Sequence, residues 1–513
     1  MSGGIAQYFT GVDYLLALPI LLLTLFAIGI LLIDLMLPAE WKWANAITAL
    51  VGIAFATAGT LKIQTWYHTQ HIDRIPTGFM GTLLVNRFSL YFFYLFLAGT
   101  AVAILMSIRY LEIERENHGE YYALLLFSVV GMMCMAAGYD IVLIFIGLEL
   151  MAISTYVLVG FLRRDKRSNE AALKYMLLGA FSSGIFAYGL SLFYGITGST
   201  NLEVIHRQLA QRIAQNGGHA DPIVIVALLA TATGLLFKIA AVPFHQWAPD
   251  AYEGAPTAVT GFMSVSVKAA GWAMLLRIFL GGLHPLRMVY VPMVIFVSIA
   301  TMTAANFAAL TQNNLKRLLA YSSIAHVGYM LLGLVAGDAT SLNANGIKGI
   351  LVYLLVYTFM NLGAFAVITS LRHREVIGDE IDDIAGLYSR APVEAVLMLI
   401  FLLSLAGIPP LAGFWGKYFI FLSLVESGHY TLAALGVLYS VFGLYYYLRV
   451  ANAMLMRQPL EKEKLPLSPA MGLALFVTAA ATLVIGVFPN SMIRAVDEVL
   501  GLTQVAPLAH LLR

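Results

Sequence analysis

Cysteine and charge are both scarce in this chain. Cys134 is the only cysteine among 513 residues, which excludes a disulfide, an iron–sulfur cluster or a thiolate metal site within the chain. Charged residues make up 11% of the chain, against roughly 25% in a soluble globular protein. The sequence also lacks HExxH, CxxC, Walker A and convincing GxGxxG patterns, so metal, nucleotide and flavin chemistry have no support. Any redox chemistry must therefore belong to partners.

Apolar residues dominate what is present. They make up 60% of the chain, and the mean hydropathy is +0.83, which indicates that the lipid bilayer is the solvent of this protein. The formal net charge is only +2, and the basic residues lie in short clusters between apolar runs, which excludes a nucleic-acid surface. The first apolar run, 14–37, is longer than the core of a signal peptide. We therefore expect a retained helix there and no targeting segment.

The apolar runs predict an all-α integral membrane protein with a single membrane domain over residues 1–513. A spanning helix needs about 20 mainly apolar residues, and this length fits about fourteen segments. The expected spans are 14–37, 44–62, 88–111, 120–138, 140–162, 169–195, 222–242, 256–280, 287–310, 317–336, 345–371, 392–424, 430–455 and 468–489. Two pieces lie outside them: residues 201–214 have the spacing of a surface amphipathic helix, and 378–390 form an acidic loop.

Lysine and arginine in the short loops predict the orientation. The loops after odd-numbered helices hold the larger share of these residues, and the side of a membrane protein richer in Lys and Arg is the cytoplasmic one. We therefore expect both termini outside the cytoplasm.

Two predicted helices contain a proline break next to a lysine. Helix seven carries Lys238 before Pro243, and helix twelve carries Lys417 after the pair Pro409 and Pro410. Proline removes a helical hydrogen bond and leaves backbone carbonyls free to bind water or ions. Interrupted helices at matching places indicate two repeats in a transporter fold, and an ordinary proline kink is the alternative.

The repeat that these breaks predict has five helices per unit. Helices four to eight, 120–280, form the first unit, and helices nine to thirteen, 287–455, form the second. Three helices at 14–111 and one at 468–489 lie outside the units. Because the number of helices per unit is odd, the second unit is inverted relative to the first.

Ionisable residues occur near the centres or breaks of the predicted spans. Such residues cost several kcal/mol in a bilayer and usually mark ion paths or ion pairs. The candidates are Glu149, Lys174, Lys238, Lys268 and Lys417. Helices five and six are joined by a short loop, so Glu149 and Lys174 are expected to meet as an ion pair. Lysine can take up and release a proton whereas arginine stays protonated, so these positions favour a proton path.

Each of these residues also has a structural interpretation. Lys238 and Lys268 can form structural pairs, and Lys174 lies close enough to a helix end to extend to the interface. His245 and His326 are candidate relay groups, with buried, hydrogen-bonded core histidines as the alternative. The remaining charges near span ends are expected to be interfacial: Asp34, Asp140, Arg277 and Glu426.

Three motifs resemble the antiporter-like membrane subunits of bacterial respiratory complex I, the proton-translocating NADH:quinone oxidoreductase. Residues 237–257 read FKIAAVPFHQWAPDAYEGAPT, residues 319–329 read LAYSSIAHVGY, and residues 407–414 read GIPPLAGF. Within this family the chain is most similar to the fourteen-helix subunit that carries a lysine after the helix-twelve break, as Lys417 does here.

The resemblance implies a translocase subunit that carries no redox centre and binds no cofactor or metal. FMN, iron–sulfur clusters and quinone would belong to other subunits, and the partners would be membrane-arm subunits and the lipid of a bacterial inner membrane. Opening of the Glu149–Lys174 pair would change the proton affinity of Lys238. A proton would then pass through Lys268, with water and His245 or His326, to Lys417.

Two other functions remain open. A subunit of a multisubunit cation/proton antiporter also carries the helix-five glutamate and a helix-twelve lysine. A scaffold that binds lipid or quinone would use the buried charges only as structural pairs.

Overall fold

The computed structural model describes residues 9–70, 76–337, 345–372, 378–459 and 467–501. Over these ranges the chain is helical, and its only β-type pairings are isolated bridges. The long helices of the first half are α1 Gly11–Asp34, α2 Ala44–Thr69, α3 Arg87–Glu114, α4 Gly119–Ala137, α5 Ile141–Val159, α6 Lys166–Thr197 and α8 Pro222–Ile239. Those of the second half are α12 Arg287–Leu310, α13 Leu315–Ala336, α14 Asn345–Leu371, α18 Tyr430–Met456 and α19 Pro469–Val487.

Several shorter helices complete the fold. They are α7 Leu202–Gln215, α9 Trp247–Gly254, α10 Thr257–Phe262, α11 Lys268–Leu276, α15 Leu387–Arg390, α16 Pro392–Ala406, α17 Ala412–Glu426 and α20 Asn490–Val499. The π-helical segment Met263–Val267 joins α10 to α11, and a second, Arg277–Gly282, follows α11, so that residues 257–282 form one membrane-length helix.

The predicted number of spans is confirmed. Thirteen helices of the described chain are long and apolar enough to cross a membrane, and the broken pair α16 and α17 forms the fourteenth. The expected amphipathic helix at 201–214 is also confirmed, because α7 buries Leu202, Ile205 and Leu209 on one face.

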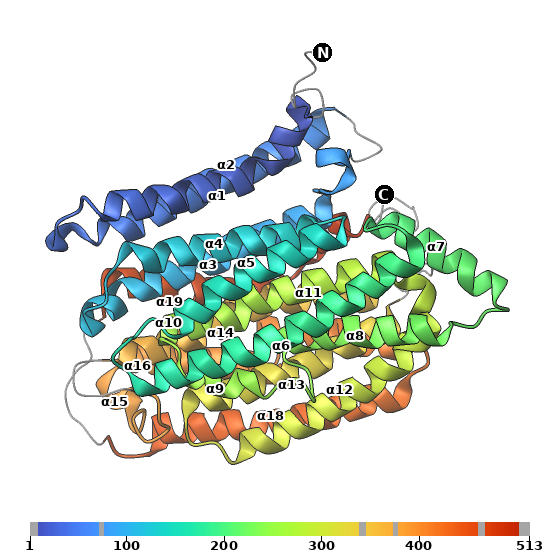
Figure 1. Ribbon diagram of the computed structural model, residues 1–513. Coiled ribbons are helices and arrows are strands. Elements are labelled where there is room, and N and C mark those ends of the chain that lie inside the picture. The colour runs from blue at the N-terminus through green and yellow to red at the C-terminus, as the bar shows by residue number, and fades with distance from the viewer. Residues whose placement is uncertain (1–8, 71–75, 338–344, 373–377, 460–466, 502–513) are drawn as a thin grey trace.

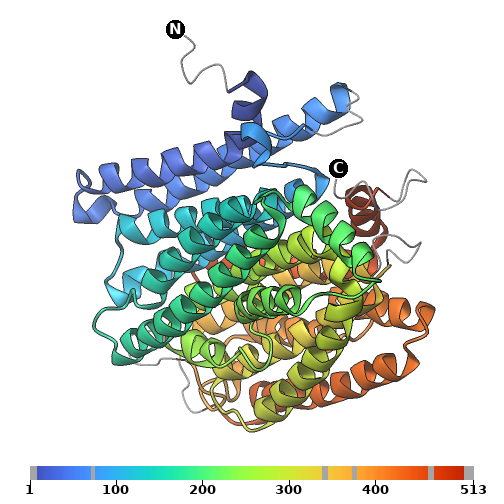
Figure 2. The same ribbon diagram turned by 45° about the vertical axis from the view of Figure 1, so that its right-hand side comes forward.

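The helices lie side by side with their axes roughly parallel, and they differ in depth within the bundle (Figure 1). The pair α1 and α2 packs on one side, where α1 contacts α4 and α2 contacts α3; the turned view shows the same arrangement (Figure 2). The helix over residues 257–282 is wholly buried, and α13 and α14 are nearly so. These three helices form the core around which the others pack.

Glycines allow the closest helix crossings. At the crossing of α4 and α5, a Cβ added to Gly131 would lie 2.5 Å from the carbonyl oxygen of Gly147, and one added to Gly147 would lie 2.7 Å from that of Gly131. Lipid provides little hydrophobic drive between helices, so small residues that permit backbone contact contribute strongly to this packing.

Both predicted helix breaks are confirmed, and they share one type of ending. The helix α8 ends at Ala240 with φ of 60°, and α16 ends at Gly407 with φ of 88°. The next amide closes the turn in each case, from Ala241 to the carbonyl of Leu236 and from Ile408 to the carbonyl of Leu403. This is the Schellman pattern, in which a left-handed residue ends a helix and pairs some of its last carbonyls.

Candidate functional site

Lys238 lies in the last turn of α8, directly before the first break. Its side chain is buried, and its ammonium lies 5.8 Å from the centre of the Tyr175 ring. Glu149 of α5 is close enough to interact with it electrostatically. The Glu149 Oε1 atom is buried and has no hydrogen-bond partner among the described residues, so the carboxylate is not committed to another group. Lys238 is therefore the lysine that shares an environment with Glu149.

The expected ion pair between Glu149 and Lys174 is wrong. Lys174 instead contacts Glu170 at 2.8 Å and Asp250 at 3.0 Å, and its side chain is 46% exposed. The short loop between α5 and α6 makes them neighbours, but it does not fix the rotation of α6 about its axis. Lys174 belongs to a partly exposed network in which Arg317 also binds Asp250, at 2.8 Å. It lies outside the buried line of lysines.

Lys268 begins α11 immediately after the π-helical segment Met263–Val267. The side chain is 2% exposed, and its ammonium donates hydrogen bonds to the hydroxyl and the carbonyl oxygen of Ser323 on α13. No carboxylate forms an ion pair with it in the described parts of the chain. A lysine held only by neutral acceptors can lose its proton without leaving an unpaired anion behind.

Lys238 and Lys268 lie on packed helices. Gly271 follows Lys268 by about one turn, and a Cβ added there would lie 3.5 Å from Lys238 Cγ. The absence of a side chain at Gly271 thus lets α8 approach α11 close to both lysines.

His326 on α13 lies between the second and third lysines. It interacts electrostatically with both Lys268 and Lys417. Its two ring nitrogens form hydrogen bonds with the hydroxyls of Tyr353 and Tyr447, the second at 3.0 Å. His326 is therefore a hydrogen-bonded core histidine that also lies between two lysines, and its relay role stays a prediction.

Lys417 lies in α17, after the second break. Its ammonium donates a 2.8 Å hydrogen bond to the carbonyl oxygen of Ala406, at the end of α16, and lies 5.0 Å from the centre of the Tyr329 ring. The break thus leaves a backbone acceptor that the buried lysine uses, as the sequence predicts. The same end of α16 is closed by Ser404, whose hydroxyl accepts from the Gly413 amide at 3.0 Å.

His245 is not joined to the lysines. It lies in the segment between α8 and α9, half-buried, and its Nδ1 atom has no hydrogen-bond partner among the described residues. Trp247 contributes more to the break, because its indole N–H donates to the carbonyl of Phe237 at 2.9 Å. A relay role for His245 stays a prediction.

Two features of the site do not follow from the sequence, namely the tyrosines near the buried lysines and the burial of one arginine. Tyr175, Tyr329, Tyr353 and Tyr447 surround the buried lysines and His326, but tyrosine is common in this chain and its contacts come from other helices. Arg277 was expected at the interface, and the structure buries it instead. Its guanidinium donates a 2.7 Å hydrogen bond to Ser89 and another to the carbonyl of Ala136, near the end of α4. A polar pocket between α3 and α4 therefore holds this cation.

The remaining expected interfacial charges lie at helix ends. Asp34 pairs with Lys42 at 2.8 Å, and Asp140 begins α5 by accepting from the amide of Val142. Glu426 ends α17 and accepts from Asn345. In the described residues, no group of three or more His, Cys, Asp or Glu side chains is arranged to hold a metal ion.

The chain is similar to known membrane proteins of one family. The family described as NADH:quinone oxidoreductase/Mrp antiporter, TM matches residues 138–443, which include every buried lysine and His326. NADH-quinone oxidoreductase subunit N 1 of Koribacter versatilis (strain Ellin345) is 66% identical over 505 residues, 98% of each chain. Subunit N 2 of Solibacter usitatus (strain Ellin6076) is 50% identical over 492 residues, 95% of this chain and 97% of its own.

The chain is also similar to a solved structure in its three-dimensional fold. A chain of respiratory complex I from Thermus thermophilus is 32% identical, with a TM-score of 0.76 over 93% of this chain and 99% of its own. The chain thus belongs to the NADH:quinone oxidoreductase/Mrp antiporter transmembrane family.

Proposed function

We propose that this chain is a proton-translocating membrane-arm subunit of a bacterial NADH:quinone oxidoreductase, in the place that subunit N has in its relatives. The observation that carries the proposal is the buried series Lys238, Lys268, His326 and Lys417. Lysine and histidine can exchange protons, and buried ionisable groups in membrane proteins usually line ion paths. The identity of 66% with a subunit N over nearly the whole chain supports the same complex.

The proposed mechanism needs no cofactor in this chain. Quinone reduction in partner subunits changes the charge near Glu149, and Glu149 in turn changes the proton affinity of Lys238. A change at Lys238 alters the field at Lys268 across the close contact of α8 with α11. A proton on Lys268 then passes by way of His326 to Lys417 and leaves the membrane. The transfers from Lys268 to His326 and from His326 to Lys417 each move a proton from the charged form of one side chain to the neutral form of the next.

The packing of the helices supports the inverted repeat as part of this proposal. The units are residues 120–280 and 287–455, outside which lie 14–111 and 468–489. In the first unit α4 packs on α5 and α6 on α8; in the second, α12 packs on α13 and α14 on α16 and α17. One lysine lies beside each break: Lys238 is in the last turn of α8, and Lys417 of α17 donates to the carbonyl of Ala406 at the end of α16. In the inner membrane we propose that both termini face away from the cytoplasm, as the Lys and Arg of the loops indicate.

Replacement of Lys238 or Lys268 with alanine tests the function in membranes that contain the assembled complex. We expect NADH oxidation by quinone and proton pumping to fall together by at least about tenfold, because general acid–base groups contribute factors of that size or larger. The exposed Lys62 of α2 provides the control, and Lys62→Ala should leave both rates unchanged. Normal pumping by assembled Lys238→Ala and Lys268→Ala complexes would indicate a scaffold.

A cation/proton antiporter is the second candidate, because the matched family includes both classes. The same variants separate it from the first. An antiporter subunit would show sodium-dependent growth or transport defects while NADH oxidation stayed normal.

A further inference from the structure

Lys174 and Tyr175 are consecutive residues of α6 that point in different directions. Lys174 is partly exposed and binds Asp250, whereas Tyr175 is completely buried. Neighbouring residues of an α-helix are about 100° apart around its axis, so the rotation that directs Lys174 outward directs the Tyr175 ring inward. The residue of α6 that reaches the surroundings of Lys238 is therefore a tyrosine.

The Tyr175 ring presents its face to Lys238. The Lys238 ammonium lies over this face, 5.8 Å from the ring centre, and both side chains are buried. The face of an aromatic ring carries partial negative charge and attracts a cation within about 6 Å, most strongly where water is excluded. The Tyr175 hydroxyl lies 3.5 Å from that of Thr155, at the long limit of a hydrogen bond. The ring therefore contributes more to this contact than the hydroxyl does.

Two aromatic neighbours hold the Tyr175 ring in this orientation. Trp247 of α9 stacks on it, with 4.5 Å between the ring centres and 15° between the ring planes. Tyr156 of α5 lies at 4.7 Å with its plane nearly perpendicular. Stacked and edge-to-face arrangements at such distances are the favourable ones for aromatic pairs. The position of the ring is thus fixed by residues from two other helices.

Trp247 also joins this ring to the first helix break. It is the first residue of α9, directly after the break. Its indole N–H donates to the carbonyl of Phe237 at 2.9 Å, and the two rings lie 5.5 Å apart. Phe237 directly precedes Lys238 in the last turn of α8. Trp247 therefore reaches back across the break to the turn that carries the lysine.

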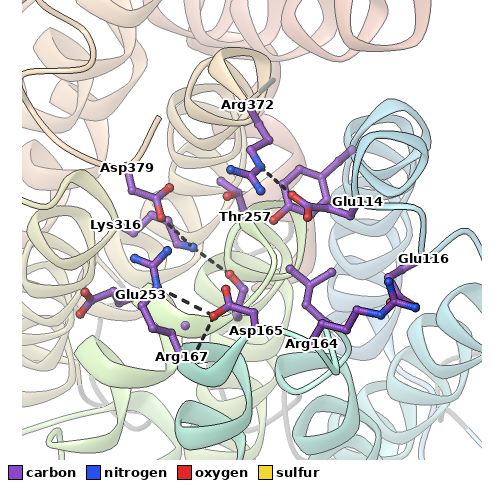
Figure 3. Close-up of a pocket in the computed structure, with 14 residues that line it drawn as sticks. Glu114, Glu116, Arg164, Asp165, Arg167, Glu253, Thr257, Lys316, Arg372 and Asp379 are labelled. Atoms are coloured by element: carbon purple, nitrogen blue, oxygen red, sulfur yellow. Dashed lines mark hydrogen bonds and ion pairs between the residues drawn. The ribbon is translucent and has the colours of Figure 1, made fainter. Parts of the chain in front are cut away.

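Charged groups fix the other end of α9. Glu253 binds Arg317 at 2.7 Å, and the Lys316 ammonium donates to the carbonyl of Ala255 at 2.8 Å. Glu253 and Lys316 are among the side chains that line a charged cavity at this end of the bundle (Figure 3). The short helix α9 is thus anchored at one end, and its first residue lies against Tyr175.

The second break uses its tryptophan differently. Lys417 also lies near a tyrosine ring, 5.0 Å from the centre of Tyr329. Trp415, after that break, donates its indole N–H to the carbonyl of Gly486 on α19 at 2.9 Å. The tryptophan after the first break thus contacts the turn that carries the lysine, whereas the tryptophan after the second contacts another helix.

We propose that Tyr175 and Trp247 form an aromatic clamp that positions Lys238, in which the Tyr175 ring holds the ammonium by cation–π attraction and Trp247 holds that ring against the break. The inference rests on the proposed function and adds two positioning residues to it. The ring attracts the charged ammonium and not the neutral amine, so the contact depends on the proton of Lys238. The clamp keeps this ammonium within electrostatic range of Glu149.

Graded fluorination of the ring at position 175 tests the clamp in the whole complex. Tyr175→Phe keeps the ring and should retain half the wild-type pumping rate or more. Phenylalanine analogues with one, two and three ring fluorines keep nearly the same size but progressively remove negative charge from the ring face. We expect pumping and NADH oxidation to fall stepwise, by about fivefold with three fluorines, which corresponds to about 1 kcal/mol. Equal rates for Tyr175→Phe and all three fluorinated analogues would overturn the proposal.

Removing the ring or its neighbour gives a second measurement with matched controls. Tyr175→Leu should lower both rates by at least about fivefold. Trp247→Phe keeps a ring to stack but loses the donation to Phe237, and we expect a loss of about two- to fivefold. Tyr445→Leu, at an exposed position of α18, and Trp415→Phe, which removes a similar hydrogen bond, should stay within about twofold of wild type. Wild-type rates in assembled Tyr175→Leu and Trp247→Phe complexes would contradict the clamp.

The proposed function and the clamp fail differently. If the assembled Lys238→Ala complex pumps normally, the proposed function is wrong. If Lys238→Ala is inactive while Tyr175→Leu and the trifluorinated analogue pump normally, only the clamp is wrong.

Discussion

The buried lysines differ in what surrounds their charge. Lys238 has the Glu149 carboxylate within electrostatic range, whereas Lys268 is held by Ser323 and Lys417 by the carbonyl of Ala406. Desolvating a charge is costly unless it is paired, so a lysine with only neutral partners has a small preference for keeping its proton. Lys268 and Lys417 are therefore suited to carry the transferred proton, and Lys238 to sense Glu149.

Because Glu149 interacts with Lys238 and not with Lys174, substitutions at these positions should differ in their effect. Glu149→Gln removes the charge that acts on Lys238, and we expect pumping to fall by at least about tenfold. Lys174→Ala removes two partly exposed ion pairs, each worth about 0–1 kcal/mol, so its effect should be smaller than that of Glu149→Gln. Both rates are measured by fluorescence quenching in inside-out vesicles with equal amounts of assembled complex. A larger loss with Lys174→Ala than with Glu149→Gln would restore the original pairing.

A permanent positive charge at position 268 should not restore the function of Lys268. Arginine remains protonated at all physiological pH values, so Lys268→Arg retains a cation at this position but cannot release a proton. We expect Lys268→Arg to be as inactive in pumping as Lys268→Ala, with assembly checked on native gels. Recovery of pumping to half the wild-type rate or more would mean that Lys268 acts only as a fixed charge.

The depth of these residues within the membrane could be predicted from the sequence, but the residues that contact them could not. The positions of Lys238, Lys268 and Lys417 relative to span ends and prolines placed them correctly in the interior. The partner of Lys174 depends on the rotation of α6, which a short loop leaves free. The contact of Ser323 with Lys268 joins residues 55 apart in sequence. Such contacts come from tertiary packing, which periodicity does not describe.

At the scale of elements, the spans were predictable and the irregular turns were not. The thickness of the bilayer fixes the length of an apolar run, and the expected span 345–371 coincides with α14. Proline residues likewise predicted the interruption between α16 and α17. The π-helical segment before Lys268 has no proline or glycine within it, so nothing in its composition distinguishes it from an ordinary helix.

The two helix breaks differ in the residue that ends the helix before the break. Ala240 adopts a left-handed conformation that favours glycine, whereas the corresponding residue in helix twelve is Gly407. We expect Ala240→Gly to stabilise the complex by about 0.5–1 kcal/mol. Gly407→Ala should destabilise it by about 1–3 kcal/mol, since the added Cβ would also lie 2.9 Å from Lys417 Cδ. Thermal dissociation of the purified complex measures both changes, and equal midpoints for the two variants would contradict this account.

At the scale of the whole molecule, apolar helices of the described chain surround the buried series Lys238, Lys268, His326 and Lys417. The helix over residues 257–282, α13 and α14 are the most buried, and the first two carry Lys268 and His326. The helices with the most exposed surface, α1, α6 and α18, lie around them. The groups of the proposed proton path therefore lie on the helices that are most buried within the described chain.

In the proposed path, continuity between Lys268 and Lys417 depends on His326. Replacing it with phenylalanine keeps an aromatic ring of similar size but removes both hydrogen-bonding nitrogens next to Tyr353 and Tyr447. The most direct test is the simultaneous measurement of NADH oxidation and proton pumping by the assembled His326→Phe complex in liposomes. We expect both rates to fall together by at least about tenfold. Pumping at the wild-type rate in that complex would contradict it.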